Sequence, residues 1–359
     1  MTDRTHTVAS TLGPSELRLI DANANRAREG IRTAEDYLRF RVGNGRWAAK
    51  LKAARHSVSQ LISGHFSIEQ LTASRDVPGD PLRPGPEEEE RAAESSQTVA
   101  LRGLKRAQEA LRVLEEYTRP VSATTAVQFA QCRFGLYEAE QWLIHGSAAA
   151  QAIAAATVYV VLTKSLCRNG LLKTAEGVIR GGATLLQFRE KEITCDDCLL
   201  TEARDLHTLC RQLGAVLICN DRVDIALAAA AAGVHLGQSD MPPAAARTIA
   251  GERLIIGRST HSVEQAVRAV TVEQADYIGV GSVYDTSTKQ GRVLGGVELA
   301  RKVCALGLGV PIFAIGGITL ERLEELKGAG VKQVAVSSAI LAASDPTDAT
   351  RRFIETMAG

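Results

Sequence analysis

Eight short apolar runs recur through the second half of the chain, and each is followed by a stretch with helical periodicity. Strands that alternate with helices in this way lie parallel in one sheet that the helices cover. Strands buried on both faces carry almost no polar residues, and these runs fit that pattern. The runs are Val158–Leu162, Thr184–Phe188, Ala215–Cys219, Gly233–Leu236, Leu254–Gly257, Tyr277–Val280, Pro311–Ile315 and Gln333–Val336.

Eight strand–helix units predict a closed (β/α)8 barrel, a TIM barrel of the α/β class, over residues 151–359. A doubly wound open sheet is the alternative, but its usual strand count is lower. Such a barrel binds ligands with the loops that follow the carboxyl ends of its strands. Unusual polar residues should therefore gather directly after the apolar runs.

Residues 1–150 have a different pattern, which predicts an additional N-terminal all-α domain. Apolar residues step by three and four over 17–40, and the pattern returns over 97–120. Polar residues repeat as well, so the domain contains an internal duplication. The repeated Arg/Glu face has two interpretations: ion pairs on a solvated or dimerising surface, or an anion site to which Arg32 and Arg112 contribute.

Composition excludes several classes of function. The 359 residues include 42 basic and 41 acidic side chains, and aromatic residues are scarce, so nothing predicts a nucleic-acid partner. Met1–Ser10 is polar, unlike a signal peptide, and no stretch is apolar enough to predict a membrane span. We therefore expect a cytoplasmic protein with small-molecule partners. The first interpretation of the Arg/Glu face, a dimerising surface, would make the protein a homo-oligomer formed through the helical domain.

The seven cysteines are scattered, which favours reduced thiols over a disulfide framework. Cys195 and Cys198 form a C-x-x-C motif, with His207 and Cys210 further along the chain. A zinc site there is disfavoured, because no second C-x-x-C motif exists and two aspartates separate the thiols.

Polar and glycine residues do follow the apolar runs. After the last two runs they resemble the phosphate site that such barrels often build beyond their seventh and eighth strands. The residues are Gln187, Arg189 and Lys191; Asn220 and Asp221; Gln238, Ser239 and Asp240; Ser259; Thr286, Ser287, Thr288 and Lys289; Gly316 and Gly317; and Ser337 and Ser338.

Asp221 and Asp240 follow neighbouring strands and are the candidate metal ligands. Each aspartate alone would be interpreted as a helix N-cap. Together, and close to Arg189, Lys191 and Lys289, they predict an Mg²⁺ site, because Mg²⁺ favours one or two carboxylates with phosphate oxygens and water.

These motifs resemble the thiamine phosphate synthase family over residues 158–341. The resemblance rests on Gln187-x-Arg189-x-Lys191, Asn220-Asp221-Arg222, Gly233-x-His235-x-Gly237-Gln238-x-Asp240, Gly257-x-Ser259-Thr260-His261, Gly279-x-Gly281 with Thr286-x-Thr288-Lys289, and Ile315-Gly316-Gly317-Ile318. Ser282 stands where the family usually has proline, and Ser337 stands where an aliphatic residue is common.

The resemblance implies a magnesium-dependent transferase. 4-Amino-2-methyl-5-(diphosphooxymethyl)pyrimidine would lose diphosphate, and the nitrogen of a thiazole phosphate, or of its carboxylated form, would attack the exocyclic carbon. Arg189, Lys191 and Lys289 would be catalytic, and Asp221 and Asp240 would hold the metal. The pyrimidine diphosphate would contact Gln187, Phe188, Arg189, Glu190, Lys191, Asn220, Ser259 and Lys289, and the thiazole phosphate would contact Thr286, Ser287, Thr288, Gly317, Ser337 and Ser338.

Two rival functions remain for the barrel: a thiazole tautomerase of similar shape, and a non-catalytic sensor of thiamine intermediates. Retention of Lys191, both aspartates and Lys289 argues against the tautomerase. The N-terminal helices resemble a domain fused to some thiamine phosphate synthases, which implies phosphorylation of hydroxymethylpyrimidine phosphate. The chain has no recognisable ATP-binding loop, however, so a dimerisation or scaffold role stays open.

Overall fold

Two units make up the chain, residues 1–144 and 145–359, close to the boundary expected at residue 150. The computed structural model describes residues 12–76, 95–192, 195–285 and 295–359. We refer to the first as the helical unit and to the second as the barrel unit, and describe each by itself.

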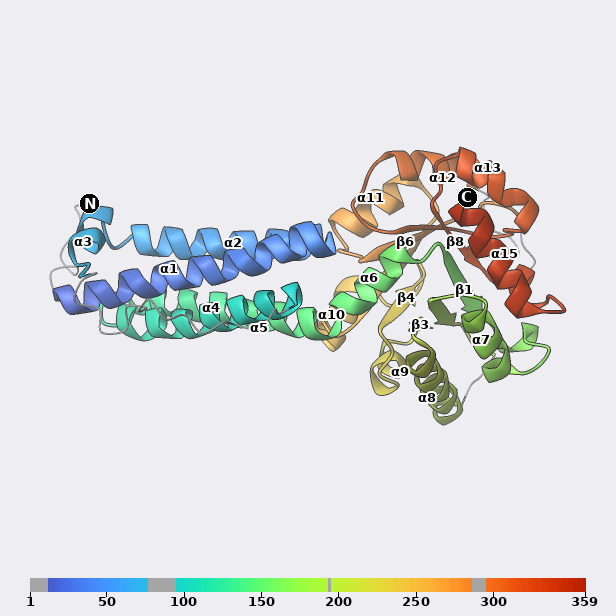
Figure 1. Ribbon diagram of the computed structural model, residues 1–359, viewed down its shortest axis with the longest axis horizontal. Coiled ribbons are helices and arrows are strands. Elements are labelled where there is room, and N and C mark those ends of the chain that lie inside the picture. Colours follow the sequence, from blue (N-terminus) through green and yellow to red (C-terminus); the bar gives the residue numbers. More distant parts are fainter. Residues whose placement is uncertain (1–11, 77–94, 193–194, 286–294) are drawn as a thin grey trace. The chain divides into compact units, whose positions relative to one another are not determined.

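Long helices form the helical unit (Figure 1). The apolar stripe expected over 17–40 is its core, because Ile20, Ala27, Ile31 and Leu38 are fully buried. The first and second copies of the duplicated pattern form α1 and α4, which pack against each other. The elements are α1 (Pro14–Asp36), the π-helical segment η2 (Tyr37–Val42), α2 (Gly45–Ser63), α3 (Ile68–Ala73), α4 (Ser96–Thr118) and α5 (Ala123–His145).

Glycines allow α1 and α4 to approach closely where they cross. A Cβ atom built on Gly30 would lie 2.3 Å from the carbonyl oxygen of Gly103. A Cβ atom on Gly103 would lie 2.8 Å from the carbonyl oxygen of Gly30. Since both obstacles are backbone atoms, a side chain at either position would force the two helices apart.

We expect Gly30→Ala to destabilise the helical unit by about 1–3 kcal/mol, as overpacking of a tight contact does. Gly135→Ala on α5 is the matched control, because nothing lies within 4 Å of its Cβ position. That exposed substitution should stabilise the unit by roughly 0.5–1 kcal/mol. The chain has two tryptophans, Trp47 and Trp142, and both lie buried in this unit, so their fluorescence during urea unfolding measures its stability alone. Equal effects of the two substitutions would contradict the packing argument.

The duplication extends to ion pairs between helices. Glu35 on α1 accepts a hydrogen bond of 2.8 Å from Arg55 on α2, and Glu115 on α4 accepts one of 3.0 Å from Arg133 on α5. Both glutamates are buried. The two copies therefore join their neighbouring helices in the same way.

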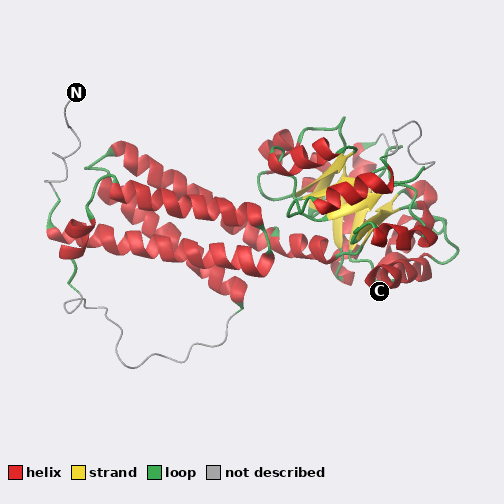
Figure 2. Cartoon of the chain, turned by 90° about the horizontal axis from the view of Figure 1, so that it is seen from above, coloured by secondary structure: helices red, strands yellow, loops and turns green. Residues whose placement is uncertain are grey.

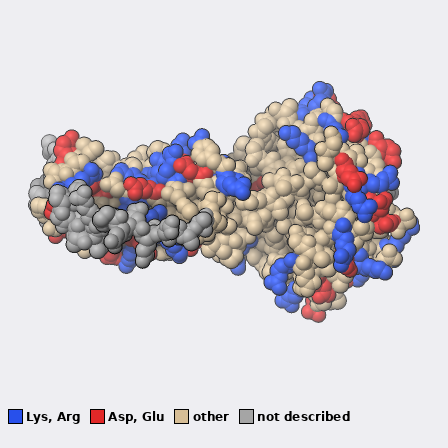
Figure 3. Space-filling model, viewed as in Figure 1, with Lys and Arg blue, Asp and Glu red and all other residues tan. Residues whose placement is uncertain are grey.

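The two arginines proposed for an anion site have carboxylate partners on their own helices. Arg32 pairs with Asp36 at 2.9 Å, and Arg112 pairs with Glu115 and Glu116, both at 2.7 Å. Acidic and basic side chains are also interspersed on the visible face of this unit (Figure 3). These contacts favour the ion-pair interpretation of the repeated Arg/Glu face.

The barrel unit is a closed parallel barrel in which each strand pairs with the next and β8 pairs with β1. This confirms the predicted (β/α)8 fold. Helices surround the strands (Figure 2). The strands are β1 (Val158–Leu162), β2 (Leu185–Phe188), β3 (Val216–Asn220), β4 (Gly233–Leu236), β5 (Ile255–Thr260), β6 (Tyr277–Val280), β7 (Ile312–Ile315) and β8 (Gln333–Val336).

Each strand is followed by at least one described helix, and short 3-10 turns precede two of these helices. The helical elements of this unit are α6 (Ser147–Ala155), η3 (Lys164–Leu166), α7 (Leu171–Arg180), α8 (Asp196–Leu213), α9 (Val223–Ala228), α10 (Pro243–Ala250), α11 (Val263–Thr271), α12 (Gly296–Ala305), η4 (Leu320–Arg322), α13 (Leu323–Gly328), α14 (Ser338–Leu341) and α15 (Pro346–Ala358).

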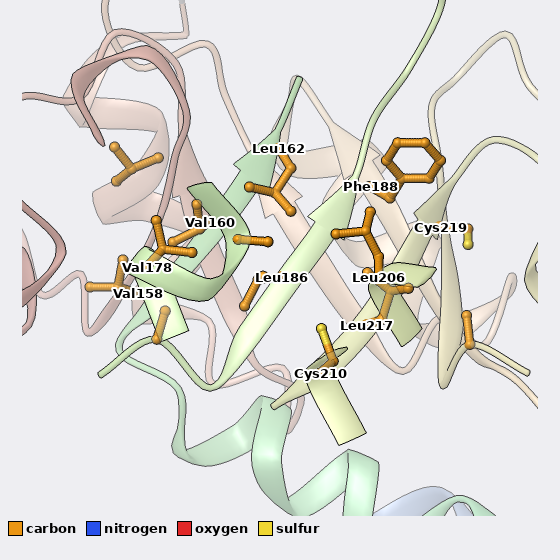
Figure 4. Close-up of a cluster of buried hydrophobic side chains, with 14 of the residues drawn as sticks. Val158, Val160, Leu162, Val178, Leu186, Phe188, Leu206, Cys210, Leu217 and Cys219 are labelled. Atoms are coloured by element: carbon orange, nitrogen blue, oxygen red, sulfur yellow. The ribbon is translucent and has the colours of Figure 1, made fainter. Parts of the chain in front are cut away.

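The strands separate an outer core from an inner one. Side chains such as Val160, Leu186 and Leu217 form the outer core with the surrounding helices (Figure 4). Residues at alternate positions, such as Tyr159 and Phe313, form the inner core. This alternation decides which side chains can reach a ligand inside the barrel.

The Ala-rich stretch Ser147–Ala156 mostly forms helix α6. Its residues Ala149 and Ile153 belong to the inner core. Gln333, at the start of β8, donates hydrogen bonds to the carbonyl oxygens of Ile153 and Ala156 at 3.1 and 2.8 Å. Helix α6 therefore packs at the amino-terminal ends of the strands and leaves their carboxyl ends to the ligand.

None of the helices in the described parts of the chain is long and apolar enough to cross a membrane.

Candidate active site

A pocket lies where the loops leave the carboxyl ends of the strands. The residues that the sequence predicts for the site and that line this pocket come from six different strand–loop junctions. They are Gln187, Arg189, Lys191, Asn220, Asp221, Ser239, Asp240, Ser259, Gly316, Gly317, Ser337 and Ser338.

Three charged groups from successive loops meet at one side of the pocket. Lys191, after β2, places its Nζ atom 2.9 Å from Oδ2 of Asp221, after β3. Asp240, after β4, interacts with Asp221, and its carboxyl group raises the pKa of Asp221. Oδ2 of Asp240 also accepts a hydrogen bond of 2.7 Å from the backbone N–H of Gly237. The three groups form one cluster, which we call the carboxylate–lysine cluster.

A left-handed backbone positions Asp221. Its φ angle is +63°, a conformation that few residue types other than glycine adopt, although aspartate and asparagine are among them. Its N–H donates to the carbonyl oxygen of His235 at 2.9 Å, and the N–H of Arg222 donates to the carbonyl oxygen of Asn220 at 2.7 Å. This tight turn directs the carboxylate into the pocket instead of along the helix that follows.

Burial is the main reason why the pKa of Asp221 is raised, and the neighbouring carboxyl group of Asp240 adds to the effect, while Lys191 opposes it. A carboxyl group with a higher pKa in the folded state binds its proton more tightly there than in the unfolded chain. Without metal, the contribution of Asp221 to stability should therefore fall as pH rises from about 4, the unfolded-state pKa, through the higher folded-state value.

We accordingly expect metal-free Asp221→Asn to be more stable than the wild type at pH ~7, because the amide cannot ionise, with the advantage shrinking towards pH ~4. Thermal unfolding of both proteins in a chelator at the two pH values measures the difference. All other titrating groups are the same in both proteins. Their effect on stability therefore cancels when the variant is compared with the wild type at each pH. An advantage that grows as the pH is lowered would contradict the sign of this shift.

The floor of the pocket contains a chain of hydrogen bonds that the sequence did not predict. Gln187 donates to the hydroxyl of Tyr159 at 2.8 Å, and that hydroxyl lies 3.0 Å from the hydroxyl of Tyr277. His235 Nδ1 is 3.2 Å from the Tyr277 hydroxyl, and its Nε2 is 2.9 Å from Oγ of Ser259. These hydrogen bonds fix the side chains of Gln187 and Ser259, two of the residues predicted to contact the pyrimidine.

Hydroxyl groups and glycines line another part of the pocket, after β7 and β8. Gly317 has a φ angle of +61°, and a Cβ atom there would lie 2.4 Å from the carbonyl oxygen of Asp285. Oγ of Ser337 and Oγ1 of Thr163 are buried and have no hydrogen-bond partner among the described residues. Buried hydroxyls without a partner are costly, so these two are placed to donate to a ligand. Thr163 was not predicted, because it follows β1, the one strand after which the sequence shows no recognisable polar motif.

Two residues named for the pyrimidine diphosphate do not line the pocket. Phe188 belongs to the outer core with Leu162 and Leu206, because its position in β2 alternates with that of Gln187 (Figure 4). Glu190 accepts hydrogen bonds from the backbone N–H groups of Lys164 and Lys191 at 3.2 and 3.0 Å. Glu190 thus shapes the loop that carries Lys191, and the contacts predicted for these two residues stay predictions.

Four predicted residues lie outside the described residues. They are Thr286, Ser287, Thr288 and Lys289, and their predicted contacts stay predictions.

The residues present fit a magnesium ion. Asp221 and Asp240 supply two hard oxygen ligands. Burial, with a smaller effect of Asp240, raises the pKa of Asp221, so a bound cation would stabilise its charged form. Within the described ranges, no group of three or more histidine, cysteine, aspartate or glutamate side chains could hold a metal on its own. The arrangement suits an ion that takes its remaining ligands from phosphate and water.

Both units match families of known proteins. A family model described as thiamine monophosphate synthase matches residues 158–340, and a model described as the ThiD2 family matches residues 18–142. A thiamine-phosphate synthase of Gloeobacter violaceus is 42% identical over 340 residues, which cover 94% of this chain and 96% of that protein. One from Synechocystis sp. is 40% identical over 337 residues, covering 94% and 95%.

A solved structure resembles the barrel unit. Thiamine phosphate pyrophosphorylase from Pyrococcus furiosus superposes with a TM-score of 0.52 at 33% sequence identity. The match covers 97% of that chain and 57% of this one.

Proposed function

The chain belongs to the thiamine monophosphate synthase family, and on that premise we propose that its barrel joins 4-amino-2-methyl-5-(diphosphooxymethyl)pyrimidine to a thiazole phosphate. The products are thiamine phosphate and diphosphate. The protein is a transferase, as its named relatives are. The carboxylate–lysine cluster carries the proposal, because it brings together a lysine and two aspartates from three loops. Lys191 lies 2.9 Å from Asp221, and Asp221 interacts with Asp240.

The leaving diphosphate governs the reaction. The bond between the exocyclic carbon and the diphosphate oxygen breaks, and the electron pair stays on the oxygen. Arg189 and Lys191 line the pocket and stabilise the negative charge that grows there. Asp221 and Asp240 would hold Mg²⁺, which when bound neutralises further charge on the diphosphate. Lys289 is proposed to contribute in the same way.

The thiazole nitrogen then forms the new bond with its own lone pair, so no general base is needed. The remaining task is to position the two reactants. Gln187, Asn220 and Ser259 orient the pyrimidine ring, and Gly317, Ser337 and Ser338 bind the thiazole phosphate. The unpartnered hydroxyl of Ser337 supports this second role. The loop residues Thr286, Ser287 and Thr288 are proposed to complete the phosphate site.

The purified chain with both substrates and Mg²⁺ should form thiamine phosphate and diphosphate in equal amounts, and a chelator should abolish the reaction. Supplying the thiazole phosphate with and without its carboxylate identifies the accepted form, and the carboxylated form would release carbon dioxide in addition. A sensor would bind the substrates without forming product, and a tautomerase would convert only the thiazole. Either outcome would refute the proposal.

We propose in addition that the helical unit phosphorylates hydroxymethylpyrimidine phosphate, the step that would supply the pyrimidine diphosphate. The match of the ThiD2 family model to residues 18–142 supports it. The full chain with ATP and the monophosphate should then form ADP and the diphosphate, and Asp221→Asn in the barrel should leave this activity intact. Absence of ADP formation would refute it.

The alternative role, pairing of two chains through this unit, predicts a dimeric mass by light scattering.

A further inference from the structure

A pair of cysteines that the proposed reaction does not use lies at the start of α8. Sγ of Cys198 is 2.7 Å from Sγ of Cys195, within about 1 Å of the ~2.0 Å length of a disulfide bond. Both side chains are exposed, and both thiols are free. Only a small movement of the two sulfur atoms would be needed to join them.

The local backbone favours Cys195 as the nucleophile of the pair. Cys195 is the N-cap of α8, an 18-residue helix, and its Sγ accepts a hydrogen bond of 3.3 Å from the N–H of Cys198. The Cys198 thiol and this amide lower the pKa of Cys195. Cys198, which donates to Cys195, has a raised pKa. The thiolate, the reactive form, is therefore favoured on Cys195.

The other five cysteines lack these features. Cys167, Cys210 and Cys219 are buried, and Cys132 and Cys304 are partly buried. Burial raises the pKa of each of these thiols. A metal role for the pair has no support either, because no third ligand joins it in the described part of the chain.

We propose that Cys195 and Cys198 form a redox-active dithiol that exchanges reversibly with low-molecular-weight disulfides such as glutathione disulfide. The thiolate of Cys195 attacks one sulfur of glutathione disulfide, the sulfur–sulfur bond breaks, and one glutathione leaves as a thiolate. Cys198 then gives its proton to solvent and attacks Sγ of Cys195, which releases the second glutathione. Two protein thiols are oxidised to one disulfide, and one glutathione disulfide is reduced to two thiols.

Mass spectrometry of the full chain after incubation with glutathione disulfide tests this assignment. The wild type should lose two hydrogens, and peptide mapping should locate a disulfide between Cys195 and Cys198. Cys198→Ser should accumulate a mixed disulfide with glutathione on Cys195, because the resolving thiol is missing. Cys195→Ser should react more slowly than Cys198→Ser. Dithiothreitol should reverse each change.

Two controls separate this site from general thiol oxidation and from misfolding. Cys304→Ser, which removes a partly buried thiol, should behave as the wild type. The far-ultraviolet circular dichroism spectrum of each variant should match that of the wild type. Absence of an internal disulfide in the wild type, or glutathione attached first to Cys198 or to another cysteine, would overturn the proposal.

Discussion

Asp221→Asn is expected to lower kcat/KM of the synthase reaction by a factor on the order of 10²–10³, the range for loss of one preorganised charge interaction in an active site. The carboxylate is both a candidate metal ligand and the partner of Lys191 at 2.9 Å. Asparagine keeps its size and tolerates the left-handed backbone at φ +63°. The loss should therefore come from the missing charge, in a protein that stays folded.

Asp224→Asn is the matched control for this substitution. Asp224 follows in the same segment and pairs with Arg222 at 2.6 Å, but its side chain is 64% exposed and does not line the pocket. Steady-state rates measured with both substrates should be close to wild type for Asp224→Asn. Equal losses in the two variants would show that the segment, and not the pocket carboxylate, matters.

Lys191→Met is expected to lower kcat by a similar factor, with a smaller effect on KM. Charge on the diphosphate grows as the bond breaks, so the ammonium interacts more strongly with the transition state than with the bound substrate. Methionine retains much of the length of the side chain without its charge. Single-turnover rates measure the chemical step separately from substrate binding.

Lys332→Met is the control, since Lys332 directly precedes β8 at the opposite end of the barrel. The activity of the Lys332→Met variant should match that of the wild type. The double variant Asp221→Asn with Lys191→Met should lose less than the product of the two single losses, because both changes disrupt the same cluster. Fully multiplicative losses would mean that the two groups act independently, contrary to this account.

Hydrophobic patterning was sufficient to predict the barrel. The strands predicted at Val158–Leu162, Gly233–Leu236, Tyr277–Val280 and Gln333–Val336 have the same limits in the structure. Parallel strands in a closed barrel end at one rim, so residues that follow them meet there whatever their separation in sequence. This is why Lys191, Asp221 and Asp240 could be brought together without coordinates.

Other features depend on packing that the sequence does not reveal. Tyr159 and Tyr277 count as apolar residues in their strands, and only the closed barrel brings their hydroxyls within 3.0 Å of each other. Phe188 was included because it lies between Gln187 and Arg189, although alternation along β2 turns it to the outer core.

Binding of Mn²⁺ as a substitute for Mg²⁺, followed by the electron paramagnetic resonance signal of free Mn²⁺, tests the carboxylate–lysine cluster most directly. Both ions favour carboxylate, phosphate and water ligands. With the pyrimidine diphosphate present, the wild-type barrel should remove Mn²⁺ from solution, and the double variant Asp221→Asn with Asp240→Asn should bind it much more weakly. Equal Mn²⁺ binding by the two proteins would contradict the assignment of these aspartates as the metal site.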